Sequence, residues 1–287
     1  MVEDFAEGRV CFDDNAEGPL HEETSPIQVG EVKNSSTKGS VLLLVIFSGT
    51  AGVTAAFTQL GGEALGLDHV VDKNRVKGPV SKVDLCKAQN QQIVMQWLDE
   101  GKVDAVMLAP PCGTSSRARE IPIIGKNGQR RRAPQPLRNS KWPDGRPSLK
   151  GLDAMKVRLA NKLYSFTRRV IDRCCELSIP FICEHPQRSW MWETSFFQSL
   201  PAICRFQCIH SCMYGGRRLK KTALLMNFTA RNLLLTCDNK HSHLPWGKTL
   251  HKGKSVFSTS TEAEYPWPLC KQLALAFALQ LQQLNKS

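Results

Sequence analysis

Apolar and polar residues follow one another along the chain in segments typical of strands and helices. Residues 40–49 (SVLLLVIFSG) form a continuous apolar run ending in glycine, which indicates a buried central strand. The segment 50–62 predicts a helix that stops at paired glycines, and residues 63–68 (EALGLD) predict a second strand. Residues 89–101 predict a helix that leads into a strand at 103–109 (VDAVMLA).

The same alternation continues in the second half of the chain. Apolar side chains recur at steps of three or four from Leu152 to Leu177, which predicts one long amphipathic helix. Residues 179–186 (IPFICEHP) predict another buried strand, and residues 211–216 and 222–228 a closing hairpin. Residues 261–284 predict a capped amphipathic helix. Such alternation favours an α/β fold with a mostly parallel sheet covered by helices.

Composition narrows the class of protein. A chain of 287 residues with 41% hydrophobic residues is long enough for one sizeable α/β domain. No apolar run reaches the roughly 18 residues that a membrane span needs, and the acidic start lacks a secretory pattern. Eleven cysteines, an odd number in a chain of this size, favour reduced thiols and an intracellular protein, which we expect to be monomeric.

Charge divides the chain into two predicted regions. Residues 1–38 hold nine acidic and three basic side chains, so this tail carries −6 and is expected to be disordered. Because the whole chain carries +12, the predicted domain at residues 39–287 carries +18. Residues 117–150 contain ten basic and two acidic side chains and predict a basic loop. A body this basic favours a polyanionic partner, most commonly nucleic acid, although a basic solvated surface is the alternative.

Polar groups follow the first predicted strands. The turn FSGTAGVT after the first strand contains glycines that would let the backbone approach a ligand. Asp68 ends the second strand 19 residues after Gly49, about where a nucleotide fold places an acid for ribose hydroxyls. Asp84 ends a possible third strand at residues 80–86. No Walker sequence follows, and nothing selects a dinucleotide.

Two further strand ends carry groups with chemistry of their own. Cys112 follows two prolines that direct the chain out of the sheet, and nearby arginines would favour its thiolate. Glu184 ends an apolar strand, where burying a carboxylate is costly unless it is paired or acts as an acid. The structural alternatives are a buried apolar cysteine and an ion pair of Glu184 with an arginine such as Arg188.

In this order, Phe-x-Gly-x-x-Gly, Asp, Pro-Pro-Cys and Glu-x-Pro resemble the DNA cytosine-5 methyltransferases, especially the short viral and mobile-element-like members. The resemblance covers about residues 41–280 and implies the Rossmann-like S-adenosylmethionine-dependent methyltransferase fold with a closing antiparallel hairpin. It implies that Cys112 attacks carbon 6 of a flipped-out cytosine and that Glu184 hydrogen-bonds the ring edge. The resemblance also implies a pocket for S-adenosylmethionine lined by Phe47, Gly49, Gly52, Asp68, Asp84 and Pro110.

The resemblance further implies DNA as the partner, with RNA as an alternative, and a nuclear location if the cell is eukaryotic. Phosphate contacts would come from the basic loop and from a second basic segment (YGGRRLKK). The residues assigned to nucleic-acid binding are Arg117, Arg119, Arg130, Arg131, Arg132, Arg217, Arg218, Lys220 and Lys221. In the second segment, a basic surface hairpin is the alternative.

The chain also departs from the family pattern. Ala51 replaces a glycine, Gly113 replaces a glutamine, and His185 stands in a Glu-His-Pro triplet where Glu-Asn-Val is commoner. Two other hypotheses therefore stay open, an amino-group methyltransferase acting on adenine or cytosine and an inactive nucleic-acid-binding relative. Ala109 and Cys112 occupy positions where amino-group enzymes usually carry an acidic or amide residue and an aromatic residue.

A metal site is an open question. The segment CDNKHSHLPWG offers Cys237, His241 and His243, and Cys208, His210 or Cys212 would complete a set of ligands. Zinc motifs usually consist of tighter pairs than these, so the sequence leaves the metal undecided.

Overall fold

The computed structural model describes residues 41–72, 74–121, 123–124, 130–131, 135–251 and 254–286. The predicted tail at residues 1–38 and Arg132 lie outside the described residues. A central sheet of seven strands runs through the described part in the order β3-β2-β1-β4-β7-β9-β8. The strands are β1 (Leu42–Ile46), β2 (Glu63–Asp68), β3 (Val80–Lys82), β4 (Ala105–Leu108), β7 (Phe181–Pro186), β8 (Arg205–His210) and β9 (Lys221–Met226).

The sheet is mostly parallel and closes with an antiparallel strand. The strands β3, β2, β1, β4 and β7 run in one direction, and β9 runs against both of its neighbours, β7 and β8. This is the Rossmann-like methyltransferase fold that the alternation of segments and the resemblance predicted. The order of the strands reverses between β1 and β4, the place where folds of this kind bind ligands.

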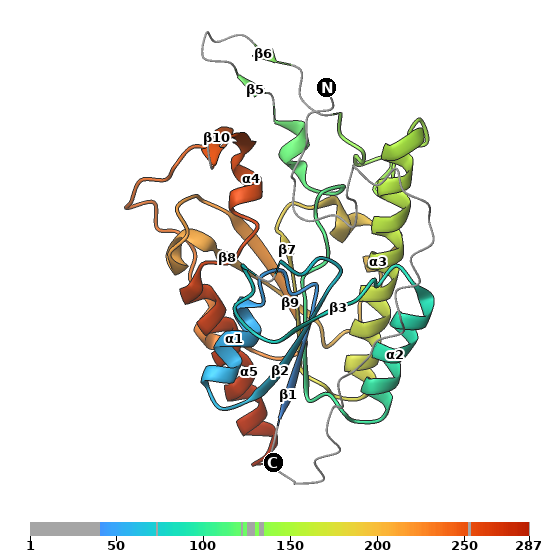
Figure 1. Ribbon diagram of the computed structural model, residues 1–287, viewed down its shortest axis with the longest axis vertical. Coiled ribbons are helices and arrows are strands. Elements are labelled where there is room, and N and C mark those ends of the chain that lie inside the picture. The colour runs from blue at the N-terminus through green and yellow to red at the C-terminus, as the bar shows by residue number, and fades with distance from the viewer. Residues whose placement is uncertain are drawn as a thin grey trace.

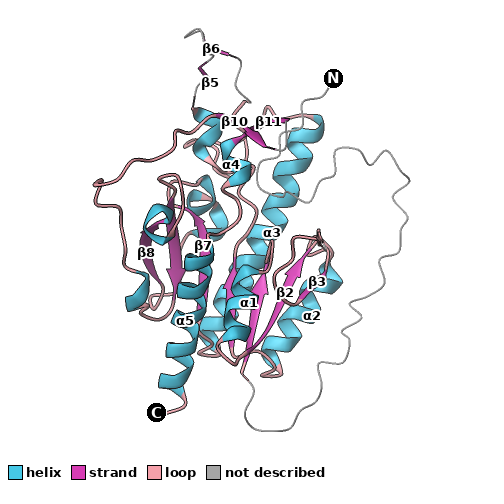
Figure 2. Ribbon diagram, turned by 60° about the vertical axis from the view of Figure 1, so that its left-hand side comes forward, coloured by secondary structure: helices cyan, strands magenta, loops and turns pink. Residues whose placement is uncertain are grey.

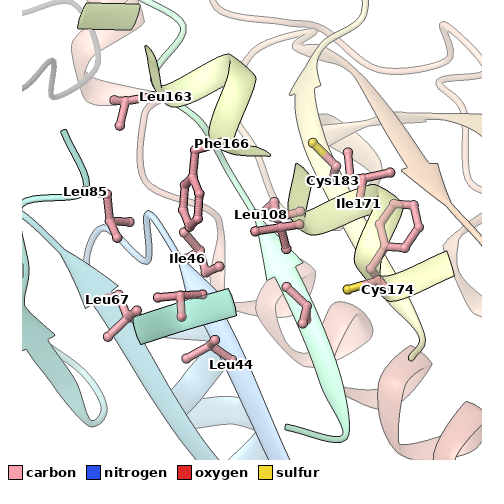
Figure 3. Close-up of a cluster of buried hydrophobic side chains, with 14 of the residues drawn as sticks. Leu44, Ile46, Leu67, Leu85, Leu108, Leu163, Phe166, Ile171, Cys174 and Cys183 are labelled. Atoms are coloured by element: carbon pink, nitrogen blue, oxygen red, sulfur yellow. The ribbon is translucent and has the colours of Figure 1, made fainter. Parts of the chain in front are cut away.

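Helices cover both faces of the sheet (Figures 1 and 2). The apolar run of β1 is buried on both faces because successive side chains of a strand point to opposite sides. Leu44 and Ile46 pack toward α2 and α3, whereas Leu43 and Val45 pack toward α1 and α5. Figure 3 shows the first of these layers, in which Phe166 of α3 faces Ile46. The helices are α1 (Gly52–Gln59), α2 (Ala88–Asp99), α3 (Gly151–Glu176) and α5 (Trp267–Leu284).

The closing hairpin is formed by different residues from those predicted. β9 contains most of the predicted segment 222–228, but its partner is β8, which the sequence analysis missed. Residues 211–216 instead form the 3-10 turn η4 (Ser211–Tyr214), which ends at Gly215 with φ of 87°. β8 was missed because it is an edge strand with exposed side chains such as Phe206, and so lacks the apolar run of a central strand.

The last helix starts later than predicted and lacks the expected side-chain cap. The short helix α4 (Ser258–Thr261) precedes it, and α5 begins after Pro266 with no capping hydrogen bond from a side chain. Its apolar face is buried together with that of α1, in the same cluster of side chains. Among the described helices, none combines the length and apolarity that crossing a bilayer requires.

Short strand pairs and turns complete the described chain. β5 (Ile123–Ile124) pairs with β6 (Arg130–Arg131), and β10 (Lys248–His251) pairs with β11 (Lys254–Phe257). The predicted basic loop therefore contains a short hairpin and, just after Cys112, the 3-10 turn η1 (Arg117–Glu120).

Candidate active site

The predicted site residues lie at one edge of the sheet, where the parallel strands end. The register aligns Ile46 of β1 with both Leu67 of β2 and Leu108 of β4. It also aligns Leu108 with Cys183 of β7. The loop that carries Cys112 therefore leaves β4 directly beside Glu184, and the loop after β1 lies between the ends of β2 and β4. Such an edge is the usual ligand-binding position in open α/β sheets.

The loop after β1 has an unusual backbone. Phe47, Gly49 and Ala51 all have positive φ, at 63°, 57° and 56°. Only glycine adopts this conformation without cost, and such strain in a bulky residue is typical of functional loops. The Ser48 hydroxyl is buried in this loop without a hydrogen-bond partner. At Gly49 a Cβ would meet nothing within 4 Å, so open space lies next to this backbone.

Gly52 is required for packing. A Cβ at this position would lie 2.7 Å from the Sγ of Cys270 on α5. Because real contacts of this kind are longer, a side chain here would force either the Cys270 side chain or the two helices to move. The last helix thus holds the start of α1, which follows the loop after β1.

The two predicted cofactor carboxylates both stabilise local backbone. Asp68, buried at the end of β2, accepts a hydrogen bond from the Gly49 N–H at 2.7 Å and one from the Val70 N–H at 3.3 Å. It thereby joins the ends of β1 and β2. Asp84 lies two residues after β3, and its Oδ1 accepts from the Cys86 N–H at 2.9 Å.

The loop that carries Cys112 is held by a chain of buried hydroxyl groups. The Tyr164 hydroxyl, on α3, donates to the carbonyl of Pro111 at 2.9 Å and lies 2.8 Å from the Ser115 Oγ. The Ser189 hydroxyl donates to the Ser115 Oγ at 2.9 Å. The carbonyl of Cys112 itself accepts from the N–H of Ser115 at 3.0 Å. The backbone on both sides of Cys112 is therefore fixed, and Pro110 lies in the same rigid loop.

Arg138 extends this support although the sequence assigned its region to phosphate binding. Its side chain is fully buried and donates to the Thr114 Oγ1 at 3.1 Å, the Asn161 Oδ1 at 2.8 Å and the Pro143 carbonyl at 2.8 Å. Burial lowers the pKa of Arg138. The residue thus ties the middle of the basic loop to the turn that follows Cys112.

Glu184 is a buried carboxylate with two differently placed oxygens. It lies within β7, two residues before the strand ends, and pairs in register with Leu224 of β9. Its Oε2 accepts a hydrogen bond of 2.7 Å from the Tyr265 hydroxyl, whereas its Oε1 is buried without a hydrogen-bond partner. The Nζ of Lys220 lies 3.9 Å from Oε1. The cation near this carboxylate is therefore Lys220, and not an arginine such as Arg188 as the alternative had it.

Tyr265 is a partner of Glu184 that the sequence analysis missed. Burial, and after it the neighbouring Glu184 carboxylate, raise its pKa well above the usual value. The phenol therefore remains protonated and donates to Glu184. No local pattern marks it, because it precedes α5 in a segment that contacts β7 only in the folded chain.

His185 lies beside the Cys112 loop as a neutral side chain. It is fully buried, with its ring 6.1 Å from that of Tyr164 and 5.8 Å from that of Trp192. Burial lowers its pKa to about 3, against the opposing effect of the Pro111 backbone. This residue, which follows Glu184 in the strand, thus packs as an uncharged ring.

The structure places the residues predicted to bind nucleic acid in different surroundings, some held by contacts within the protein and some exposed. Arg117 stacks over the Trp190 ring at 3.8 Å, and the Nε of Arg119 donates to the Gly113 carbonyl at 3.1 Å. Arg218 is buried and ion-paired with Glu262 at 2.7 Å, which gives it a structural role. Arg217 and Lys221 are exposed. Lys220 lies beside Glu184. Arg130 and Arg131 form the short strand β6.

Comparisons with known proteins give matches among solved structures. No protein-family model and no curated protein matches the chain. The Entamoeba histolytica methyltransferase EhMeth shares 13% identity over 71% of this chain and 58% of its own, with a TM-score of 0.41. The Dnmt2 methyltransferase of S. pombe shares 10% identity over 71% of this chain and 57% of its own, with a TM-score of 0.40.

A Dnmt2 mutant from Spodoptera frugiperda shares 12% identity over 76% of this chain and 57% of its own, with a TM-score of 0.35. The chain spans less than two thirds of the length of each of these proteins. Its own strand order, with one antiparallel strand next to the last, identifies the Rossmann-like methyltransferase fold.

Proposed function

We propose that the protein transfers a methyl group from S-adenosylmethionine to carbon 5 of a cytosine in DNA. The observation that carries this proposal is the state of Glu184 beside the Cys112 loop. One carboxylate oxygen is held by Tyr265, and the other is buried without a hydrogen bond, with the Nζ of Lys220 3.9 Å away. Leaving a buried acceptor unsatisfied is costly, so its retention supports a role in binding a ligand.

The chemistry follows from these two side chains. The Cys112 thiolate forms a bond to carbon 6 of the cytosine, and the electrons of the ring double bond move toward carbon 5 and the ring edge. Glu184 gives a proton from Oε1 to the ring nitrogen at that edge, which neutralises the developing negative charge. After carbon 5 takes the methyl group, its proton passes to solvent water and the bond between sulfur and carbon 6 breaks. The thiolate is thereby regenerated, and the ring nitrogen returns its proton to Glu184.

The residues around the first loop fit the methyl donor. The open space beside Gly49 supports a ligand against this backbone. Phe47, Gly49 and Gly52 would line its pocket, Asp68 and Asp84 would face its ribose and adenine, and Pro110 would separate it from the base. When bound, S-adenosylmethionine supplies an activated methyl group on sulfur. The buried Asp68 would keep its bond to Gly49, because a carboxylate can accept several hydrogen bonds.

Nucleic acid must present the base outside its stack. Neither carbon 5 nor carbon 6 can be reached inside a duplex, so the cytosine is flipped into the site. Among the described residues assigned to nucleic-acid binding, Arg217 and Lys221 are exposed, and we expect them to contact phosphates.

Covalent trapping tests the proposal. A fluorine at carbon 5 cannot leave as a proton does, so DNA containing 5-fluorocytosine holds the enzyme as an adduct once the methyl group has been transferred. We expect a denaturation-resistant complex with the wild-type protein in the presence of S-adenosylmethionine, and none with Cys112→Ser. The matched control is Cys86→Ser, which alters a half-buried cysteine after β3 and should still form the adduct.

Three outcomes would contradict the proposal. Adducts with both the wild type and Cys112→Ser would remove Cys112 from the chemistry, and adducts with neither would remove the carbon-5 mechanism. An adduct only with the corresponding RNA would replace the substrate. Mass spectrometry of methylated DNA adds a further arm, in which 6-methyladenine would favour an amino-group methyltransferase.

A further inference from the structure

Four side chains outside the proposed active site converge on one point. Cys212, Cys237, His241 and His243 each offer one sulfur or nitrogen atom, and these four atoms all lie within 4.8 Å of one another. The Cys237 Sγ is 3.4 Å from the Nε2 of His243 and 3.8 Å from the Nε2 of His241. Two thiols and two imidazoles are the ligands of a common class of structural zinc site.

The spacing of the four atoms fits a tetrahedral ion. Bonds of about 2.3 Å from zinc to sulfur and about 2.0–2.1 Å from zinc to nitrogen place neighbouring ligand atoms about 3.3–3.8 Å apart. The separations from Cys237 to the two histidines agree with these values. Since all four atoms lie within 4.8 Å of one another, side-chain movements of about 1 Å would bring them to the separations of a tetrahedral site.

The surrounding groups position the ligands as a second layer. The Asn239 N–H donates to the Cys237 Sγ at 3.3 Å, in a turn where Asn239 has φ of 59°. The Asp238 carboxylate lies 3.7 Å from the Nδ1 of His241, on the ring nitrogen opposite the proposed ligand atom. A hydrogen-bond donor to a thiolate and a carboxylate behind a histidine are typical of zinc sites.

We propose that Cys212, Cys237, His241 and His243 bind one zinc ion that stabilises the fold. The four protein ligands close the coordination shell, which distinguishes a structural from a catalytic zinc. Of the cysteines that the sequence left open, the structure brings in Cys212 from η4 instead of Cys208 from β8. His210 is excluded as an Nδ1 ligand, because that nitrogen accepts the Cys237 N–H at 2.8 Å.

The ion would hold an irregular segment of the chain in place. Residues 234–247 contain no helix or strand, and irregular segments of this length usually need an anchor. Three of the ligands come from this segment, and the fourth comes from the turn after β8. The segment ends where the Leu244 N–H donates to the Arg217 carbonyl and the Pro245 carbonyl accepts from Arg218. Zinc would therefore attach the segment to the antiparallel end of the sheet.

Metal analysis of the full chain, purified without a histidine tag and without added zinc, tests this proposal. We expect about one zinc per chain by elemental mass spectrometry, and less than about one tenth of that in Cys237→Ala and His243→Ala. Cys208→Ala is the matched control, because it removes a neighbouring cysteine outside the cluster and should retain the metal. Absence of zinc from the wild type, or an unchanged content in Cys237→Ala, would overturn the proposal.

A second measurement avoids dependence on variants that fail to fold. After zinc is removed from the wild-type protein by a chelator, titration with Co²⁺ should produce the intense visible absorption of tetrahedral cobalt bound to thiolates. A spectrum of octahedral, oxygen-ligated cobalt would overturn the proposal. So would a disulfide between Cys212 and Cys237, detected by the mass of the alkylated, unreduced protein. Neither measurement uses methyl transfer, so the zinc site stands or falls separately from the proposed reaction.

Discussion

The candidate active site lies at the edge of the sheet where the parallel strands end, and its two sides hold their side chains in different ways. On the side of β1 and β2, the loop is shaped by backbone conformation, with three positive φ angles, and by close packing of Gly52 against Cys270. On the side of β4 and β7, Cys112 and Glu184 are held by buried polar side chains from distant segments, namely Tyr164, Ser189, Arg138 and Tyr265. The first side is therefore sensitive to added volume, and the second to lost hydrogen bonds or charge.

The largest expected effect is the loss of catalysis in Glu184→Gln. The amide keeps the size of the side chain and can still accept from Tyr265, but it cannot give a proton to the ring nitrogen and take it back. We expect methyl transfer to fall by about 100-fold or more, as is usual when an acid–base group is removed. Initial rates with radiolabelled S-adenosylmethionine measure this. Glu193→Gln, at an exposed position of the neighbouring turn, should retain full activity, and equal losses in both variants would contradict the role of Glu184.

Next in size is the destabilisation expected from Arg138→Met. Methionine fills part of the volume but leaves the Thr114 hydroxyl, the Asn161 amide oxygen and the Pro143 carbonyl without their donor. The expected loss in free energy of unfolding is about 3 kcal/mol. Urea denaturation measures it against Arg158→Met, at an exposed position of α3. Equal stability of the two variants would mean that the guanidinium does not support the loop.

The close packing of α1 against α5 beside the first loop is tested by Gly52→Ala. The new methyl group would meet the Cys270 Sγ at 2.7 Å, so we expect a loss of about 2 kcal/mol in the free energy of unfolding. In Gly52→Ala combined with Cys270→Ala, the next atom of residue 270 is its Cβ at 3.8 Å, an ordinary contact. The second substitution should therefore cost less in the Gly52→Ala background than in the wild type. Strictly additive losses would show that the two positions are not coupled.

The smallest expected effect, taken per pH unit, is a pH dependence due to His185. Its folded pKa of about 3 lies below the value of 6.5 for an exposed imidazole. Between these values the unfolded chain binds a proton that the folded chain does not, so stability falls as the pH drops. The contribution is fully present above about pH 6.5 and is lost by at most about 1.4 kcal/mol per pH unit below it. His185→Asn should show a shallower decline than the wild type in denaturation series between pH 7 and pH 4. Parallel declines would contradict the assignment.

Elements with a strong local pattern could be predicted from the sequence. β2 was predicted with its observed bounds, and the long helix α3 within one residue at each end, because an apolar run or a period of three to four residues depends on nearby residues alone. The turn of Phe47, Gly49 and Gly52 was found for the same reason.

The polar support of Cys112 and Glu184 could not be predicted in this way. Tyr265 reaches Glu184, and Tyr164 reaches Pro111, across long stretches of chain, and such pairs leave no periodic signal. Arg138 carries the same charge as a phosphate-binding arginine, and only its burial distinguishes it. Similarly, the sequence alone does not distinguish Cys208 from Cys212 as a metal ligand. Only the turn after β8 in the folded chain brings Cys212, and not Cys208, next to Cys237.

The contact between Gly52 and Cys270 has a consequence for how the protein matures. The first helix of the sheet domain packs against the last one, so a chain still on the ribosome cannot complete this layer until α5 has emerged. Until then, the apolar faces of α1 and of β1 on that side are open to water and to other chains. A chain shortened just before Trp267 would keep every residue proposed to perform chemistry and yet be prone to aggregate.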